Sequence, residues 1–443
     1  MFFNVFAIRS HGPASTDERR DTPPPGMGDT VAICNATAMI RNHKGRRLRH
    51  NRRLTDGREL RVFYMIGTMG IGGAESQVVL RAKELRARGV DSRVLLLFDG
   101  GPFEAFLQDA GVPVVHLRFR TISTAGWRRA LLCDVAAFCR LVRLLRQARP
   151  HVLHAHLFHS YAIGVPAGKL AGVPLVVAGR HTPLMITGRG LLTSLIDRAA
   201  NHMADHIVPV SQSIADELSS RFRVHHKISV IHNGLPPTAF LPHSPAPLET
   251  EFPVVICVSR LQPLKGHRYL LDAAALLELR GLRCTIVLIG DGPERGNLER
   301  QAEQLGIDVR FPGFRTDVHA WLARADIMAH PTLAEALGNC IMEAMAAGLP
   351  TVSTRVGGVP ELLEENRGLL VPPADAAALA DAIQRLLTDH VLAKRLGASA
   401  QAWAVDHLTS DRLVNRYLST YARLIRQKFA TDLNIPIGHR AQR

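Results

Sequence analysis

Cysteine is scarce in this sequence. None of its six cysteines belongs to a Cys-x-x-Cys pair, which argues against a disulfide framework and a structural zinc site. We therefore expect buried, reduced thiols. No apolar run approaches the ~18 residues that a membrane-spanning helix needs. The first residues also lack the long apolar core of a secretion signal. These absences predict a cytoplasmic protein.

Acidic residues are outnumbered, since 39 aspartates and glutamates face 54 lysines and arginines, for a formal net charge of +15. Such an excess favours anionic partners. Residues 1–59 combine dense arginines with proline and glycine and show little periodicity, so we expect a disordered basic extension. Aromatic residues do not interleave these arginines, which argues against a nucleic-acid-binding tail, and no nucleic-acid partner is expected.

From Leu60 onward, short β-rich runs alternate with helical segments, a pattern typical of right-handed βαβ units and parallel sheets. A proline-rich stretch interrupts the alternation once. We predict an α/β protein with two Rossmann-like, doubly wound domains that face each other across a cleft. The expected strands are 61–66, 92–98, 151–156, 174–179, 206–210 and 227–233, then 253–259, 284–290, 308–313, 326–331, 350–354 and 368–373. The expected units are the 1–59 extension, domain 60–240, linker 241–252, domain 253–408, crossing helix 409–430 and tail 431–443.

Two loops at predicted strand ends suit an anionic ligand. In GTMGIGGAES, Gly72 and Gly73 precede a helix, where backbone N–H groups bind anions; an ordinary βα turn is the alternative. In SRLQPLKG, Arg260 and Lys265 follow the first strand of the second domain. A guanidinium fork and an ammonium suit the oxygens of a diphosphate, and two solvated surface charges are the alternative.

The segment EALGNCIMEAMAAG places two acids around a helix start. Gly338 and Asn339 favour a helix beginning, so Glu335 falls in the loop and Glu343 about one turn inside. The free amides near Leu337 to Asn339 would bind an anion. A carboxylate accepts hydrogen bonds from two adjacent hydroxyls. Glu335 and Glu343 therefore suit sugar hydroxyls, and with the amides between them they suit a nucleotide-sugar. The alternative for Glu343 is a partner of the helix dipole.

Histidines form a second cluster, His151, His154, His156 and His159. A metal site is conceivable here, but no cysteine or carboxylate joins them, and we predict none. His181 ends a strand at the expected cleft edge. It is either a loop histidine or a residue that faces the ligand.

Together these segments resemble the retaining nucleotide-sugar glycosyltransferases of family 4, which have the GT-B fold. The similarity covers about residues 60–428. The segments that carry it are GGAE (72–75), HAH (154–156), RH (180–181), VIHNG (230–234), SRLQPLKG (259–266), GDGPER (290–295) and the Glu335–Glu343 segment with EAMAAGLPTVST.

The resemblance implies a role for each matching residue. Arg260 and Lys265 would bind the diphosphate of a UDP- or GDP-sugar, with Gly72 and Gly73 beside the phosphates. Glu343 would hold the ribose. The catalytic pair Glu335 and His181 would contact the transferred sugar, helped by the backbone of Leu337, Gly338 and Asn339. Family members retain anomeric configuration and need no metal, so no cofactor is expected.

We therefore predict a retaining hexosyltransferase that acts on a glycan or lipid-linked acceptor in cell-envelope polysaccharide or glycolipid synthesis. A sugar-nucleotide epimerase of the same fold and a basic nucleic-acid binder are the alternatives. Residues 127–149 are expected to form one helix with an apolar stripe (Trp127, Leu131, Val135, Phe138, Val142, Leu145). Its arginines Arg128, Arg129, Arg140, Arg143 and Arg146 suggest peripheral contact with an anionic membrane.

Overall fold

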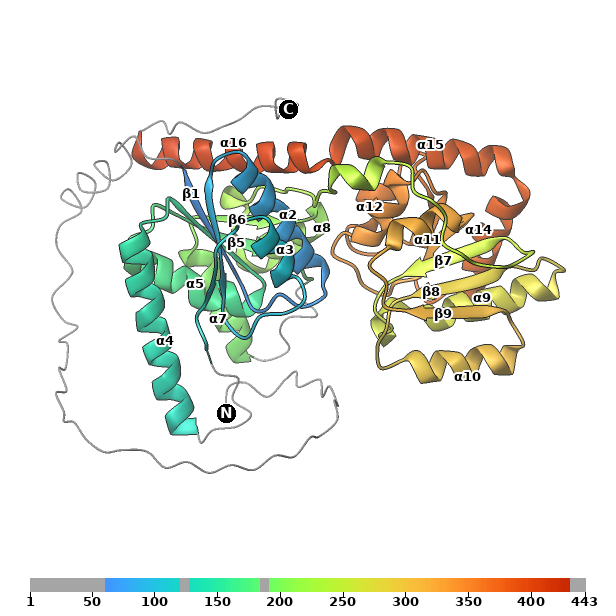
Figure 1. The fold of residues 1–443 in the computed structure, drawn as a ribbon, viewed down its shortest axis with the longest axis horizontal. Helices are drawn as coiled ribbons and strands as arrows, with labels where there is room; N and C mark the ends of the chain where they lie inside the picture. The colour runs from blue at the N-terminus through green and yellow to red at the C-terminus, as the bar shows by residue number, and fades with distance from the viewer. Residues whose placement is uncertain (1–59, 120–126, 184–190, 431–443) are drawn as a thin grey trace.

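The computed structural model describes residues 60–119, 127–183 and 191–430, with the backbone alone at 127–133. The predicted tails 1–59 and 431–443 lie outside these ranges. Two lobes stand side by side, and each is built on a six-stranded parallel sheet flanked by helices (Figure 1). The strand orders are β3-β2-β1-β4-β5-β6 and β12-β11-β10-β7-β8-β9, so both sheets have the same doubly wound topology. The predicted fold class is confirmed.

The first sheet lies between two helical layers. Residues 62, 64 and 66 of β1 join one apolar core, and residues 63 and 65 join the core on the other face. Burial on both faces is why the strand is a continuous apolar run. The strands are β1 (Arg61–Ile66), β2 (Asp91–Leu96), β3 (Val114–His116), β4 (Val152–His156), β5 (Leu175–Arg180) and β6 (His206–Pro209). The helices are α2 (Gly73–Ala87), α3 (Glu104–Asp109), α4 (Trp127–Ala148), α5 (Phe158–Ala171), α7 (Leu191–Met203), α8 (Gln212–Phe222) and the 3₁₀ turn η1 (His225–Lys227).

The second sheet repeats this construction, since alternate residues of its central strand β7 enter opposite cores. Its strands are β7 (Val254–Val258), β8 (Thr285–Ile289), β9 (Val309–Gly313), β10 (Ile327–His330), β11 (Thr351–Thr354) and β12 (Leu369–Val371). Its helices are α9 (His267–Leu279), α10 (Arg295–Leu305), α11 (Val318–Arg324), α12 (Asn339–Ala346), α13 (Val359–Leu363), α14 (Ala376–Thr388) and α15 (His390–His407), with 3₁₀ turns η2 (Pro237–Phe240) and η3 (Pro263–Lys265).

The chain crosses between the lobes twice, and the two crossings lie together. Leu235 N donates to Leu408 O at 2.6 Å, and Ser410 N donates to Leu235 O at 2.8 Å. Helix α16 (Ser410–Phe429) then runs back along the first lobe (Figure 1). Its face of Leu413, Val414, Tyr417, Leu418, Tyr421 and Ile425 is buried in the core of that lobe. The C-terminal helix therefore fastens the two lobes to each other.

Two expectations from the sequence differ from the structure in detail, and one strand was not predicted. Residues 227–233 form no strand but make a single bridge, Ile207 to Ile228, because the chain leaves the sheet edge here for the second lobe. The three-residue strand β3 was too short to predict. On α4, the predicted stripe holds at Phe138, Val142 and Leu145, which pack in the core, but Val135 is 53% exposed.

The burial of the cysteines differs from one to the next. Cys139, Cys257, Cys284 and Cys340 are free thiols, but only Cys257 is buried and Cys139 is exposed, so the expectation of buried thiols holds in part. Among the described helices, none combines the length and the apolarity needed to cross a bilayer.

Candidate functional site

In each sheet the strand order reverses between two central strands, β1 and β4 in the first and β7 and β10 in the second. Loops that leave neighbouring strands in opposite directions open a crevice at the carboxyl edge, where doubly wound sheets bind ligands. Gly72 and Gly73 follow β1, Arg260 and Lys265 follow β7, and Glu335 follows β10. The topology thus brings the predicted residues to these two edges.

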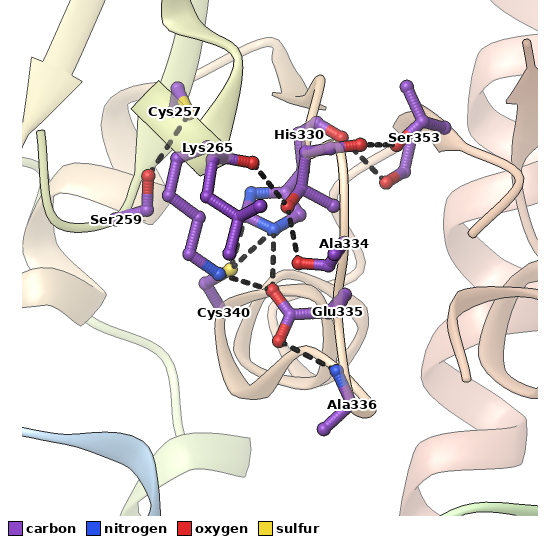
Figure 2. Close-up of polar contacts among 12 residues, drawn as sticks. Cys257, Ser259, Lys265, His330, Ala334, Glu335, Ala336, Cys340 and Ser353 are labelled. Carbon is purple, nitrogen blue, oxygen red and sulfur yellow. Dashed lines mark hydrogen bonds and ion pairs between the residues drawn. The ribbon is translucent and has the colours of Figure 1, made fainter. Parts of the chain in front are cut away.

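Glu335 is held by two side chains, one from the turn after β7 and one from the end of β10 (Figure 2). Lys265 Nζ lies 2.5 Å from Glu335 Oε2, and His330 Nε2 lies 3.1 Å from the same oxygen. The second oxygen, Oε1, accepts from the backbone N–H of Ala336 at 3.2 Å. The carboxylate therefore has a defined orientation, and Lys265 stands beside it.

The charge of Glu335 is strongly favoured. Burial would raise its pKa, but Lys265 and His330 outweigh that effect and lower the pKa of Glu335 to about 2. Burial lowers the pKa of His330 by more than Glu335 raises it, so the imidazole is neutral at pH 7. At neutral pH Glu335 is therefore ionised and the ring of His330 is neutral.

The loop after β7 places Lys265 by its backbone. Residues 263–265 form the 3₁₀ turn η3, which ends at Gly266 with φ +67°. A Cβ atom at Gly266 would overlap the carbonyl oxygen of Pro331, in the loop after β10. Glycine is needed here both for the left-handed backbone and for this close approach. The contact fixes the Lys265 loop against the Glu335 loop.

Helix α12 begins one residue after Gly338, whose φ of +98° is one that glycine adopts most easily. Its first turn is closed by Ile341 N and Met342 N, which both donate to Gly338 O. The amides of Leu337, Gly338 and Asn339 precede these bonds, so this helix start has the N–H groups that attract anions. The side chain of Leu337 is buried in the core, and only its backbone is available to a ligand.

Glu343 lies one turn further along α12, where it is half-buried. Burial raises its pKa to about 7, and among the described residues no side chain or amide hydrogen-bonds to its carboxyl group. An acid held in a desolvated position without a partner is costly to the fold. This arrangement favours a role in binding a ligand over one as a simple partner of the helix dipole.

The first lobe contacts this region directly. Asn339 Nδ2 donates to Gly73 O at 3.2 Å, and Asn233 Nδ2 donates to Asn339 Oδ1 at 2.8 Å. Arg260 is exposed, and its guanidinium makes no hydrogen bond among the described residues. Burial raises the pKa of Glu75, in the first turn of α2, and the charge of Arg260, from the second lobe, opposes that rise. The glycine loop therefore lies opposite the Arg260 and α12 loops.

His181 follows β5 and is half-buried. Its Nε2 lies 2.9 Å from His156 Nδ1, at the end of β4. Burial, followed by the nearby charge of Arg81, lowers the pKa of His181 well below its usual value. His181 is thus a neutral ring whose orientation is fixed by a second histidine. Within the part of the chain that the structure describes, no three His, Cys, Asp or Glu side chains are placed to hold a metal ion.

Comparison with known proteins decides the family. The profile of Glycosyltransferase Family 4 matches residues 71–239, and that of Glycosyl transferases group 1 matches residues 252–389. D-inositol 3-phosphate glycosyltransferase of Mycobacteroides abscessus is 30% identical over 412 residues, across 81% of this chain and 86% of the relative. This chain belongs to the group 1 and family 4 glycosyltransferases.

Other relatives and solved structures agree with this glycosyltransferase family. N-acetyl-α-D-glucosaminyl L-malate synthase of Bacillus anthracis is 23% identical over 82% of this chain and 95% of the relative. The Anabaena protein HepE in complex with UDP is similar in fold, with a TM-score of 0.71, 24% identity and coverage of 82% of this chain and all of HepE. The fold is the GT-B fold that the sequence predicted.

The sequence did not single out several residues of the glycosyltransferase site. His330, Asn233 and Cys340 each contact a predicted site residue or its partner. His330 directly precedes the Glu335 loop at the end of β10, and a polar residue at a buried strand end was the available signal. Asn233 lies within the quoted VIHNG segment, but its contact with Asn339 depends on how the lobes meet.

Proposed function

We propose that this glycosyltransferase moves a hexose from a nucleoside-diphosphate-sugar to an acceptor with retention of anomeric configuration. The observation that carries the proposal is the Glu335 carboxylate, which lies beside Lys265 and next to the amides at the start of α12. A cation and helix amides suit the diphosphate, and a fixed carboxylate suits sugar hydroxyls.

Each residue then has a distinct partner. Arg260 and Lys265 bind the diphosphate from the second lobe, and the backbone at Gly72 and Gly73 approaches it from the first. Glu343 accepts from the ribose hydroxyls. Glu335 and His181 contact the transferred sugar. Positive charges offset the negative charge that develops on the leaving phosphate, so turnover without a metal is expected.

The donor is a UDP- or GDP-sugar. HepE was crystallised with UDP and with UDP-glucose, whereas a relative from Mycobacterium tuberculosis, 29% identical over 61% of this chain, is a GDP-mannose-dependent phosphatidylinositol monomannoside mannosyltransferase. Another relative acts in lipopolysaccharide core biosynthesis. These names support a glycan or lipid-linked acceptor in cell-envelope synthesis.

A lipid-linked acceptor implies work at a cytoplasmic membrane surface, and α4 supports this. Arg140, Arg143 and Arg146 are exposed, and within the described residues none of them pairs with a carboxylate. In the same layer, α7 leaves Leu191 81% and Leu195 54% exposed. We propose peripheral contact of this layer with anionic lipid, because basic residues gain about 1 kcal/mol each near such a surface.

The test is a panel of UDP, GDP, UDP-glucose, UDP-N-acetylglucosamine and GDP-mannose in thermal-shift and nucleotide-release assays. One nucleotide family should stabilise the protein, and acceptor should accelerate nucleotide release. Proton NMR of the product then gives the anomeric configuration. Stabilisation by none of these compounds would contradict the proposal. Epimerised or free sugar formed without any need for acceptor would support the epimerase instead.

A further inference from the structure

His330 occupies a position that the proposed donor contacts do not explain. It ends β10, is fully buried and bonds to Glu335. Its carbonyl oxygen accepts from Ser353 Oγ at 2.7 Å, which ties the residue to the neighbouring strand β11 (Figure 2). The ring is therefore held in place through the backbone of the sheet, whatever occupies the cleft.

A thiol lies beside the ring. Cys340 Sγ lies 3.6 Å from His330 Nδ1 and 3.9 Å from Nε2. Burial raises the pKa of the Cys340 thiol well above its usual value, so the sulfur keeps its proton and can donate to Nδ1. Nδ1 then acts as the acceptor, and the ring proton sits on Nε2, which donates to Glu335.

Binding of the nucleotide-sugar would change which side chains donate hydrogen bonds to Glu335. In this structure Glu335 Oε2 accepts from both Lys265 and His330. A diphosphate that engages Lys265 competes for the same ammonium. His330 cannot follow, because it is buried and anchored to β11. The imidazole is thus the donor that remains on the carboxylate once the lysine turns to the phosphates.

We propose that His330 is a positioning residue that keeps the Glu335 carboxylate aimed at the transferred sugar while Lys265 binds the diphosphate. Cys340 assists by fixing the tautomer of the ring. The inference rests on the proposed function, and it adds a residue that acts through Glu335 without touching the donor. A hydrogen bond of this kind orients a functional side chain, just as the hydrogen-bond partners of metal-binding side chains orient those side chains.

The test compares His330→Leu, which keeps bulk but loses the donor, with His330→Gln, which keeps an N–H near Nε2. Losing a hydrogen bond to a charged group predicts a fall in kcat/KM for the nucleotide-sugar of about ten-fold or more in His330→Leu. His330→Gln should recover most of that loss. Affinity for bare UDP or GDP should change less than about two-fold in both, since the nucleotide does not meet Glu335.

A double-mutant cycle separates positioning from mere packing. If His330 acts through Glu335, adding His330→Leu to Glu335→Gln should cost little further kcat/KM. His206→Leu is the matched control, since His206 is also buried but bonds Ser229 at the far side of the first lobe. Its kcat/KM should equal that of the wild type, and melting temperatures check the folding of every variant.

The outcomes are distinguishable. Wild-type protein that uses no nucleotide-sugar would refute the proposed function, and this inference with it. An active wild type with unchanged kcat/KM in His330→Leu, with additive losses in the cycle, or with no recovery in His330→Gln would overturn the inference alone. A fall in bare nucleotide affinity equal to the fall in kcat/KM would assign His330 to the general integrity of the site.

Discussion

Replacing Glu343 with glutamine should stabilise the unliganded protein above pH 7 while weakening nucleotide binding. Burial raises the pKa of Glu343 from 4.5 to about 7. At 1.36 kcal/mol per pKa unit this costs the ionised folded state about 3 kcal/mol, an upper bound because the side chain keeps some exposure. The folded pKa lies above the unfolded one, so the cost is absent below about pH 4.5, grows between pH 4.5 and 7, and is complete above pH 7.

The assay is calorimetric unfolding of wild type and Glu343→Gln without ligand at pH 5.5 and 8.5. The gain in the free energy of unfolding of Glu343→Gln over the wild type should be larger at pH 8.5 than at pH 5.5. The difference should be about 1 to 3 kcal/mol, or a few degrees in Tm. Glu303→Gln is the control, because Glu303 is exposed on α10 and its substitution should change neither value. If Glu343→Gln is no more stable than the wild type, or is more stable by the same amount at both pH values, the reasoning about burial is refuted.

Nucleotide titrations complete the argument on Glu343. The carboxylate, but not the protonated acid, can accept from both ribose hydroxyls. Wild-type affinity for the preferred nucleotide should therefore rise as pH increases from 6 to 8, and Glu343→Gln should bind about ten-fold more weakly with a flatter profile. Unchanged affinity in the variant would remove Glu343 from the ribose site.

Three further predictions follow from the same geometry. Arg260→Ala and Lys265→Ala should each weaken nucleoside-diphosphate binding, measured by calorimetry, about ten-fold. Activity should also survive EDTA. Activity that is lost in EDTA and restored by a divalent ion would contradict turnover without a metal. Glu335→Gln should lower turnover about ten-fold or more while bare nucleotide affinity stays near wild type; equal losses in both would undo the assigned division of roles. A variant lacking residues 1–59 should still sediment with anionic vesicles at low salt, less so when Arg140, Arg143 and Arg146 become glutamine; binding that is unchanged by these substitutions, or equal on neutral vesicles, would exclude the arginine face.

The sequence alone predicts the fold class, because strands buried on both faces must be continuous apolar runs. The runs at β1 and β7 show this, since alternate residues enter cores on opposite sides of each sheet. It also determined where loops meet helices, as at Gly338 and Asn339, since glycine and asparagine favour helix starts. Residues with local signatures of this kind were therefore predictable.

The contacts between distant residues, in contrast, depend on the tertiary structure. Lys265 and Glu335 are 70 positions apart, and their pairing depends on β7 and β10 being neighbours in the sheet. Asn233 reaches Asn339 only because the lobes pack as they do, and His330 is recognisable only once the fold brings both Cys340 and Glu335 to its ring. Chain spacing carries no information on such contacts, because they are set by strand order and domain packing.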